Sequence, residues 1–366
     1  MSPVLFFDPG CPAPYSRRTL EHAALGGTES TVVRISEALD ARVLQHNRTE
    51  PEDRYRPPDD TAPRSEGSVE HLIVLRDPRA IRPLCGRFPG ARPYLWLHDL
   101  VRPGSKRGRR LEAAASTLAE LGVTLICVSE FQRAQAQAIL DRAGVAHRVR
   151  AVTIYNPIGD DLVANGEPID TEKLIFLSSP NKGLAFALDA FEAVRHALPG
   201  MRLCIGSPGY KGIREAGIAG PAAAIEGVVW LGPMPHARAL EEMRNALCVF
   251  YPNFVLPETF GLVFAEANAV GTPVLTHDCG AAAEVLADPR QVLPIAPAAR
   301  RYERAARLVP GALRRMLGAR AERRGVFAPY VERVRAWRSE RPRTAADPRF
   351  RLAVVTERWR VLLNGG

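Results

Sequence analysis

The strongest constraint on the fold of this chain is a repeated alternation of short apolar strands with helical patterns. A first series ends near Ile154, and after a Pro-, Gly- and Asp-rich segment at 156–170 the alternation starts again. The predicted strands are Val4–Phe7, Val43–Gln45, Leu72–Leu75, Tyr94–Leu97, Leu125–Val128 and Val152–Ile154, followed by Leu174–Leu177, Met201–Ile205, Val228–Leu231, Val249–Tyr251 and Val274–Thr276. Two consecutive series of this kind predict an α/β protein with two doubly wound, parallel-sheet (Rossmann-like) domains facing each other across a cleft.

Length and composition agree with a two-domain globular protein. The 366 residues exceed what one hydrophobic core usually supports, so we expect domains of residues 1–160 and 161–345. No apolar run is long enough to span a membrane, and the amino terminus does not resemble a signal peptide. Cys127, Cys204 and Cys248 lie within apolar strands, as expected of reduced cysteines in a cytoplasmic protein.

The net charge of +9 comes almost entirely from arginine. We interpret this as a compositional bias and expect no nucleic acid partner. A basic protein still attracts anionic partners, such as a diphosphate, an acidic glycan or an anionic membrane surface. The chain has no Cys/His spacing typical of a metal site and no Asp-x-Asp pair after a strand, so we expect no metal.

Residues 249–278 contain the most informative local pattern, a helix start between two buried strands and bracketed by two carboxylates. Glu258 precedes the helix and Glu266 lies inside it. The first amides of a helix lack intrahelical partners and carry the positive end of its dipole, so they bind anions. At about 1.5 Å per residue, the carboxylates should lie roughly 8–12 Å apart around this anion site. A nucleotide sugar has a matching layout, with sugar hydroxyls at one end, the diphosphate in the middle and ribose hydroxyls at the other end. The hydroxyls can donate hydrogen bonds to the two carboxylates. The alternative is two glutamates on a solvated helix surface.

The same stretch resembles the E-x7-E signature of family 4 retaining glycosyltransferases, usually E-G-F-G-L-x-x-x-E-A-M-A-C-G-x-P-V. The matching positions are Glu258, Phe260, Gly261, Leu262, Glu266, Ala267, Gly271, Pro273 and Val274. Thr259 stands where the family commonly has Gly, and Asn268 stands where it has Met. The resemblance implies the GT-B fold, with an acceptor-side N-terminal domain, a nucleotide-sugar-binding C-terminal domain, and a last helix within 346–366 that crosses back to the N-terminal domain.

The resemblance also assigns roles around this helix start. Glu258 would hold the donor sugar and Glu266 the ribose, with the amides of Gly261 to Val263 on the diphosphate. The donor-binding residues of this segment are therefore Thr259, Phe260, Gly261, Leu262, Val263 and Glu266. Gly232 would approach the base through its backbone.

The segment LSSPNKGL, from Leu177 to Leu184, follows a strand and opens a helix. Lys182 is placed to meet phosphate, and Ser178 and Ser179 supply hydroxyl donors. The segment is similar to an S-S-P-x-[RK]-G-L variant of the family. Many members have an Arg shortly before this Lys, and this chain does not, so Lys182 and amides alone would neutralise the diphosphate. The alternative is a plain strand–turn–helix with a solvated Lys.

Two N-terminal motifs complete the expected site. Gly26 and Gly27 in LGGTEST allow a close backbone approach, Thr28 can cap the next helix, and the motif resembles the family's G-G-x-E loop. A simple helix-entry turn is the alternative. His98 follows a buried strand, and the family resemblance implies contact with the donor sugar; a structural His is the alternative. The basic run at 102–110 could steer an acidic acceptor or a membrane surface, or form a solvated loop.

The sequence therefore predicts a metal-independent retaining glycosyltransferase without a cofactor. It would move a hexose-type sugar from a nucleoside diphosphate to a hydroxyl of a glycan or lipid-linked acceptor, in bacterial surface polysaccharide biosynthesis at the inner face of the membrane. Glu258, His98 and Lys182 are the predicted catalytic residues. The alternatives are a non-catalytic GT-B module that binds nucleotide or acts as a scaffold, and a sugar-nucleotide epimerase.

Overall fold

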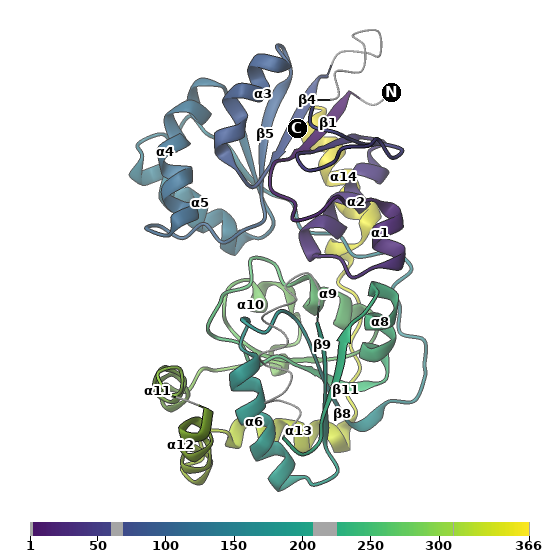
Figure 1. Ribbon diagram of the computed structural model, residues 1–366, viewed down its shortest axis with the longest axis vertical. Coiled ribbons are helices and arrows are strands. Elements are labelled where there is room, and N and C mark those ends of the chain that lie inside the picture. Colours follow the sequence, from purple (N-terminus) through teal and green to yellow (C-terminus); the bar gives the residue numbers. More distant parts are fainter. Residues whose placement is uncertain (1–2, 60–68, 208–224, 310, 366) are drawn as a thin grey trace. The chain divides into compact units, whose positions relative to one another are not determined.

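The protein divides into two compact units in the computed structural model, which describes residues 3–59, 69–207, 225–309 and 311–365 (Figure 1). The N-terminal unit comprises Met1–Asp160, Glu258–Phe260 and Pro348–Gly366. The C-terminal unit comprises Asp161–Pro257 and Gly261–Asp347. The tripeptide Glu258–Phe260 thus belongs to the N-terminal unit although the residues on both sides of it belong to the other.

The N-terminal unit contains a parallel seven-stranded sheet in the order β3-β2-β1-β4-β5-β6-β7. Its strands are β1 (Val4–Asp8), β2 (Arg42–Gln45), β3 (Tyr55–Arg56), β4 (His71–Leu75), β5 (Arg92–Leu97), β6 (Thr124–Cys127) and β7 (Ala151–Thr153). Its helices are α1 (Arg17–His22), α2 (Gly27–Ala38), η1 (Pro78–Ala80), α3 (Ile81–Arg87), α4 (Lys106–Glu120), α5 (Glu130–Arg142), η3 (Pro348–Phe350) and α14 (Leu352–Leu363). The strand order reverses between β1 and β4.

The C-terminal unit contains a parallel six-stranded sheet in the order β10-β9-β8-β11-β12-β13. Its strands are β8 (Asp170–Leu177), β9 (Arg202–Ser207), β10 (Val228–Pro233), β11 (Ala246–Phe250), β12 (Val274–His277) and β13 (Val292–Leu293). Its helices are α6 (Leu184–Ala197), α8 (His236–Arg244), α9 (Leu262–Ala269), α10 (Ala282–Val285), η2 (Pro289–Gln291), α11 (Pro297–Ala306), α12 (Gly311–Arg323) and α13 (Ala328–Glu340). The order reverses between β8 and β11. Both sheets confirm the prediction of two parallel-sheet, Rossmann-like domains.

The last helix, α14, lies beside α2 in the N-terminal unit, where the yellow end of the chain meets its purple start (Figure 1). Its buried side chains Val355, Trp359 and Leu362 recur at helical spacing and so form one apolar face. The Trp359 ring contacts those of Phe6 on β1 and Trp96 on β5, with centroids 5.8 and 4.8 Å apart. The carboxyl-terminal segment therefore completes the core of the N-terminal unit, as predicted.

His277, at the end of β12, is held as a neutral imidazole in the core of the C-terminal unit. Its Nδ1 lies 2.8 Å from the carbonyl oxygen of Leu293, and its Nε2 lies 2.7 Å from the Tyr330 hydroxyl. The carbonyl can only accept, so Nδ1 carries the proton and Nε2 accepts from Tyr330. Burial lowers the pKa of His277 to about 4.

This histidine predicts a loss of stability in mild acid. Below about pH 6.5 the unfolded chain binds a proton that folded His277 does not take up until about pH 4, so stability falls as pH falls. At pH 5 the loss should be about 2 kcal/mol of unfolding free energy. Urea denaturation at pH 7.5 and pH 5 measures it, with His277→Gln as the comparison. An unchanged pH dependence in His277→Gln would contradict the assignment.

Candidate functional site

The point of strand-order reversal in the C-terminal sheet holds the segment that follows β8. Ligands of doubly wound sheets bind at such points, outside the carboxyl ends of the strands. Ser179 is buried, and Ser178 Oγ lies 3.4 Å from the hydroxyl of Tyr251, which follows β11. The Lys182 amide donates to the Ser179 carbonyl at 2.9 Å and closes the turn that leads to α6. The sequence motif therefore lies at the strand-order reversal, the edge at which doubly wound sheets generally bind ligands.

Tyr251 and Asn253 shape the loop on the other side of the reversal point, and the sequence interpretation did not include them. The Tyr251 ring stacks on Phe176 at 5.4 Å and meets Phe264 of α9 edge-on at 5.3 Å. Asn253 Oδ1 accepts from the amides of Val255 and Leu256, a typical Asx turn. The PNF sequence at 252–254 is the signal that could have indicated this turn.

The two loops also touch at Gly183, which caps α6 with φ +90°. A Cβ on Gly183 would lie 3.3 Å from both Cβ and Oδ1 of Asn253. The left-handed backbone and the limited space both favour glycine after Lys182. The phosphate-site loop and the loop that leads toward Glu258 are therefore packed together at the end of the sheet.

Helix α9 begins after Gly261, at the predicted helix start. Gly261 is the N-cap residue with φ +89°, and a Cβ there would lie 2.4 Å from Cδ2 of Phe264. The amides of Phe264 and Ala265 both bond to the Gly261 carbonyl. The preceding amides, of Leu262 and Val263, lie at the positive helix terminus, where amides have no intrahelical acceptor.

Glu266 on α9 is bonded to a histidine that sequence reasoning missed. His236 Nε2 lies 2.7 Å from Glu266 Oε1, and the carboxylate is buried while the imidazole is about one quarter exposed. His236 is the first residue of α8 and follows the turn after Gly232, which has φ +72°. The PMPH sequence gave no reason to pair this His with a carboxylate 30 residues later.

In the N-terminal unit, the point of strand-order reversal lies between Asp8 at the end of β1 and Arg76 after β4. Arg76 has φ +62°, unusual for a residue with a side chain, and bonds to Glu29 of α2 at 2.6 Å. Burial raises the pKa of Asp8, and the charge of Arg76 opposes this rise. This cluster of Asp8, Glu29 and Arg76 was not predicted from the sequence.

The diglycine lies at the start of α2, and the helix is capped two residues earlier than expected. Gly26 is the N-cap and Gly27 the first helical residue, so the prediction that Thr28 caps the helix is wrong. Gly26 has an extended backbone and the helix begins at the next residue, so Thr28 already lies inside the helix. Because Glu29 in the first turn bonds to Arg76, the diglycine is fixed beside the carboxyl end of β4.

His98 follows β5 and is 6% exposed. Its Nε2 is buried and has no hydrogen-bond partner within the described part of the chain. Burial, and then the charge of Arg76, hold its pKa well below the usual value, so the imidazole is neutral. A neutral ring nitrogen without a partner is suited to a ligand hydroxyl. The neighbouring Asp99 instead forms an ion pair with Arg107 at 3.0 Å.

Thr259 attaches the predicted catalytic loop to His98 inside the N-terminal unit. Thr259 Oγ1 donates to the His98 carbonyl at 2.8 Å, and the Thr259 carbonyl accepts from the Ser129 hydroxyl. Phe260 is buried against the rings of Tyr155 and Phe350. Glycine has no side-chain hydroxyl, so a glycine at position 259 could not make the hydrogen bond from Thr259 Oγ1 to the His98 carbonyl.

The predicted residues fall into two sets. The N-terminal unit holds Gly26, Gly27, His98, Glu258, Thr259 and Phe260. The C-terminal unit holds Ser178, Ser179, Lys182, Gly232, Gly261, Leu262, Val263 and Glu266. Among the described residues, no three His, Cys, Asp or Glu side chains gather as a candidate metal site. A cavity of about 370 Å³ lies elsewhere, at the amino ends of β5 and β6 beside Arg92 and Arg150.

Comparison with known proteins finds a family model that is similar to part of the C-terminal unit. Residues 171–308 match the family model for Glycosyl transferases group 1. Over 146 residues the chain is 31% identical to the phosphatidyl-myo-inositol mannosyltransferase of Mycobacterium leprae (strain TN), covering 38% of each protein. Over 167 residues it is 30% identical to the D-inositol 3-phosphate glycosyltransferase of Acidothermus cellulolyticus (strain ATCC 43068 / DSM 8971 / 11B), covering 40% of this chain and 37% of the relative. The aligned segments thus span well under half of these relatives.

Solved structures match the fold along nearly the whole chain. HepE from Anabaena, in complex with UDP-glucose, superposes over 99% of both chains with a TM-score of 0.63 and 17% identity. The sucrose-phosphate synthase of Thermosynechococcus elongatus covers 99% of this chain and 98% of its own, with a TM-score of 0.60 and 18% identity. At this identity the likeness concerns the fold. Across the described ranges, no helix has the length and apolar character needed to cross a membrane.

Proposed function

We propose that this protein is a retaining glycosyltransferase, because residues 171–308 match the family model for Glycosyl transferases group 1. It transfers a hexose-type sugar from a nucleoside diphosphate to a hydroxyl of a glycan or lipid-linked acceptor, in the cytoplasm. The observation that carries the proposal is the convergence of two motifs at the reversal point of one sheet, where Gly183 packs against Asn253 and Tyr251 links Ser178 to α9. In doubly wound sheets, ligands bind at this reversal point, outside the carboxyl ends of the strands.

The proposed donor is held by groups of fixed geometry. The diphosphate lies on the amides of Leu262 and Val263 with Lys182 beside it, and Glu266 accepts hydrogen bonds from the ribose. Glu258 and the unpartnered Nε2 of His98 bind hydroxyls of the sugar. The names of two relatives include inositol, a compound with several hydroxyl groups, in agreement with an acceptor hydroxyl as nucleophile.

The reaction breaks the bond between the sugar C1 and the β-phosphate oxygen and forms a bond from C1 to the acceptor oxygen on the same face. The acceptor proton leaves with the diphosphate, whose negative charge grows as the bond breaks. Preorganised amides and the Lys182 ammonium stabilise that charge, so the step needs no metal. Surface polysaccharide synthesis is the proposed pathway.

The proposal is tested first with binding and then with turnover. Thermal shift with UDP, GDP, ADP and TDP should give one clear stabiliser, and the corresponding nucleotide sugars should then be hydrolysed slowly to that diphosphate. NMR of the transferred product should show the anomeric configuration of the donor. Absence of stabilisation by every nucleotide would overturn the proposal. Binding without turnover on any donor would support a scaffold module instead.

His236 should hold Glu266 in the orientation that binds ribose. His236→Ala removes a bond of 2.7 Å to a buried carboxylate, and groups that orient a ligand-binding residue typically contribute about tenfold or more. We expect KM for the donor to rise about tenfold with kcat little changed. His236→Gln, which can still donate, should recover much of the loss. Equal kinetics for His236→Ala and the wild type would rule out this role.

A further inference from the structure

Helices α11 and α12 of the C-terminal unit, with the connection between them, expose three large apolar side chains beside several arginines. Leu308 is 82% exposed, Met316 69% and Leu313 49%, although large apolar side chains are usually buried. They lie on α12 and on the connection from α11, and the two helices pack on each other (Figure 1). We call this surface the α11–α12 face, defined by these three residues together with Arg301, Arg304, Arg315 and Arg320.

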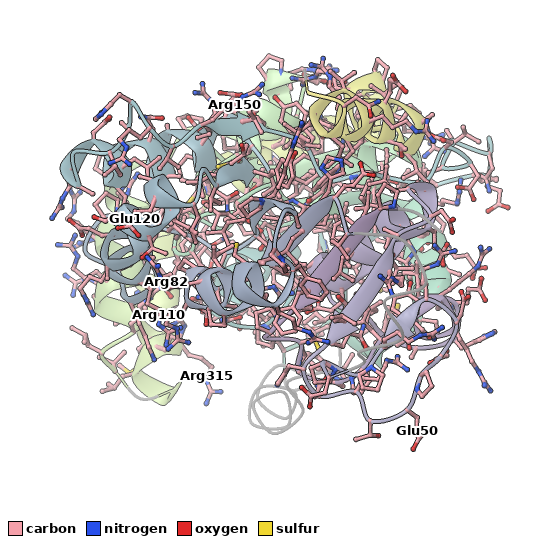
Figure 2. The ribbon with its side chains drawn as sticks, turned by 90° about the horizontal axis from the view of Figure 1, so that it is seen from above. Glu50, Arg82, Arg110, Glu120, Arg150 and Arg315 are labelled. Carbon is pink, nitrogen blue, oxygen red and sulfur yellow. The ribbon has the colours of Figure 1, made fainter. Side chains whose placement is uncertain are left out.

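Helical spacing places these residues on the outward sides of the two helices. On α11, Ala299, Tyr302 and Ala306 are buried, whereas Arg301 and Arg304 are exposed and Leu308 continues their side at i+7. On α12, Leu313, Met316 and Arg320 follow one another at i, i+3 and i+7. Figure 2 shows the Arg315 side chain extending away from the α12 ribbon. Apolar and basic side chains are therefore presented together.

The charge of this surface is strongly positive. Residues 297–324 contain nine arginines and two glutamates. Glu303 is buried and bonded to Arg307 at 2.8 Å and to Arg314 at 3.3 Å, and Glu322 pairs with His196 at 3.0 Å. The four arginines that define the face have no ion-pair partner among the described residues. Both acidic groups are thus engaged, and the outward charge is that of arginine.

We propose that the α11–α12 face binds the surface of an anionic lipid bilayer. Leu308, Leu313 and Met316 would enter the boundary between head groups and acyl chains, while the arginines bind the lipid phosphates around them. Apolar side chains gain nothing from a nucleic acid backbone, which disfavours that occupant. A second copy of the same arginine-rich surface would repel it, which disfavours symmetric self-association.

This inference extends the proposed function, because a lipid-linked acceptor would be reached at a membrane surface, but it does not depend on the donor chemistry. It also moves the expected membrane contact from the basic run at 102–110 to a different unit. The run at 102–110 leads into α4, which begins at Lys106. It carries no exposed large apolar side chain, and its Arg107 pairs with Asp99.

The test is co-sedimentation of the full chain with vesicles, without nucleotide. The protein should bind vesicles of phosphatidylcholine mixed with phosphatidylglycerol, bind pure phosphatidylcholine at least about tenfold more weakly, and be released by salt. Leu308→Ser with Met316→Ser should weaken binding about tenfold or more, and Arg301→Gln with Arg304→Gln should do likewise. All variants should keep the wild-type melting temperature.

Two matched controls distinguish vesicle binding by this face from non-specific binding by other exposed apolar or basic side chains. Val354→Ser with Val361→Ser removes two exposed apolar side chains from α14, and Arg107→Gln with Arg109→Gln removes charge from the other basic run. Both should leave vesicle binding unchanged. No binding to anionic vesicles, or an equal loss in either control, would overturn the proposal. So would a wild-type oligomer in gel filtration that dissociates in Leu308→Ser with Met316→Ser, because the face would then be a protein interface.

Discussion

Replacing Glu258 with Gln should lower kcat/KM by about 10²- to 10³-fold while the fold is kept. The amide has the size of the carboxylate but cannot accept hydrogen bonds at both oxygens or carry negative charge beside a sugar that becomes positive in the transition state. The Thr259 hydrogen bond to the His98 carbonyl and the buried Phe260 ring hold the loop in place in either case. The loss should therefore lie in kcat more than in KM.

Initial rates with the donor identified by thermal shift measure this effect. Glu258→Asp keeps the charge but shortens the side chain, and it should recover part of the activity. Glu241→Gln, an exposed position on α8, is the control for loss of one negative charge and should match the wild type. Activity within about twofold of wild type in Glu258→Gln would show that the carboxylate does not hold the sugar.

Replacing Lys182 with Met should abolish nearly all turnover, by about 10³-fold, because no second cation of this loop can neutralise the diphosphate. The segment Ser178–Lys182 contains no arginine, so the single ammonium would act with the amides of Leu262 and Val263 alone. The effect should appear both in diphosphate binding and in kcat, since the negative charge is present before the reaction and increases during it.

Thermal shift with the nucleoside diphosphate, compared with the matching nucleoside, measures how much Lys182 contributes to binding of the diphosphate. Stabilisation of Lys182→Met by the diphosphate should decrease strongly, whereas the small stabilisation by the nucleoside should be unchanged. Lys182→Arg retains the charge and should stay partly active. If the diphosphate stabilises Lys182→Met as well as it does the wild type, the assignment of this loop to phosphate is wrong.

Local patterns in the sequence were enough to predict the two parallel sheets. A strand such as Leu174–Leu177 is predicted from its run of apolar residues, and the start of α9 is predicted from the glycine before it. Both signals are local, so they can be recognised without tertiary information. The two-residue strands β3 and β13 were missed because they are too short to form a periodic pattern.

Pairs distant in sequence could not be predicted. Glu29 and Arg76 are 47 residues apart, and His236 and Glu266 are 30 apart. Each pair depends on which strand lies next to which, and strand order is set by the packing of the whole sheet. The Thr28 cap failed for a more local reason, since Gly26 can start a helix without a side-chain cap. The roles of the site residues stay predictions until the variants are measured.

The assignment of Glu258–Phe260 and Pro348–Gly366 to the N-terminal unit affects how this protein can be dissected or recombined. A fragment ending at Asp160 would lack Trp359, leaving Phe6 and Trp96 without a packing partner. A fragment of 161–347 would carry Phe260 without the rings of Tyr155 and Phe350. Chimeras that exchange the N-terminal unit should therefore transplant its three discontinuous pieces together, and a single crossover after Asp160 should give insoluble products.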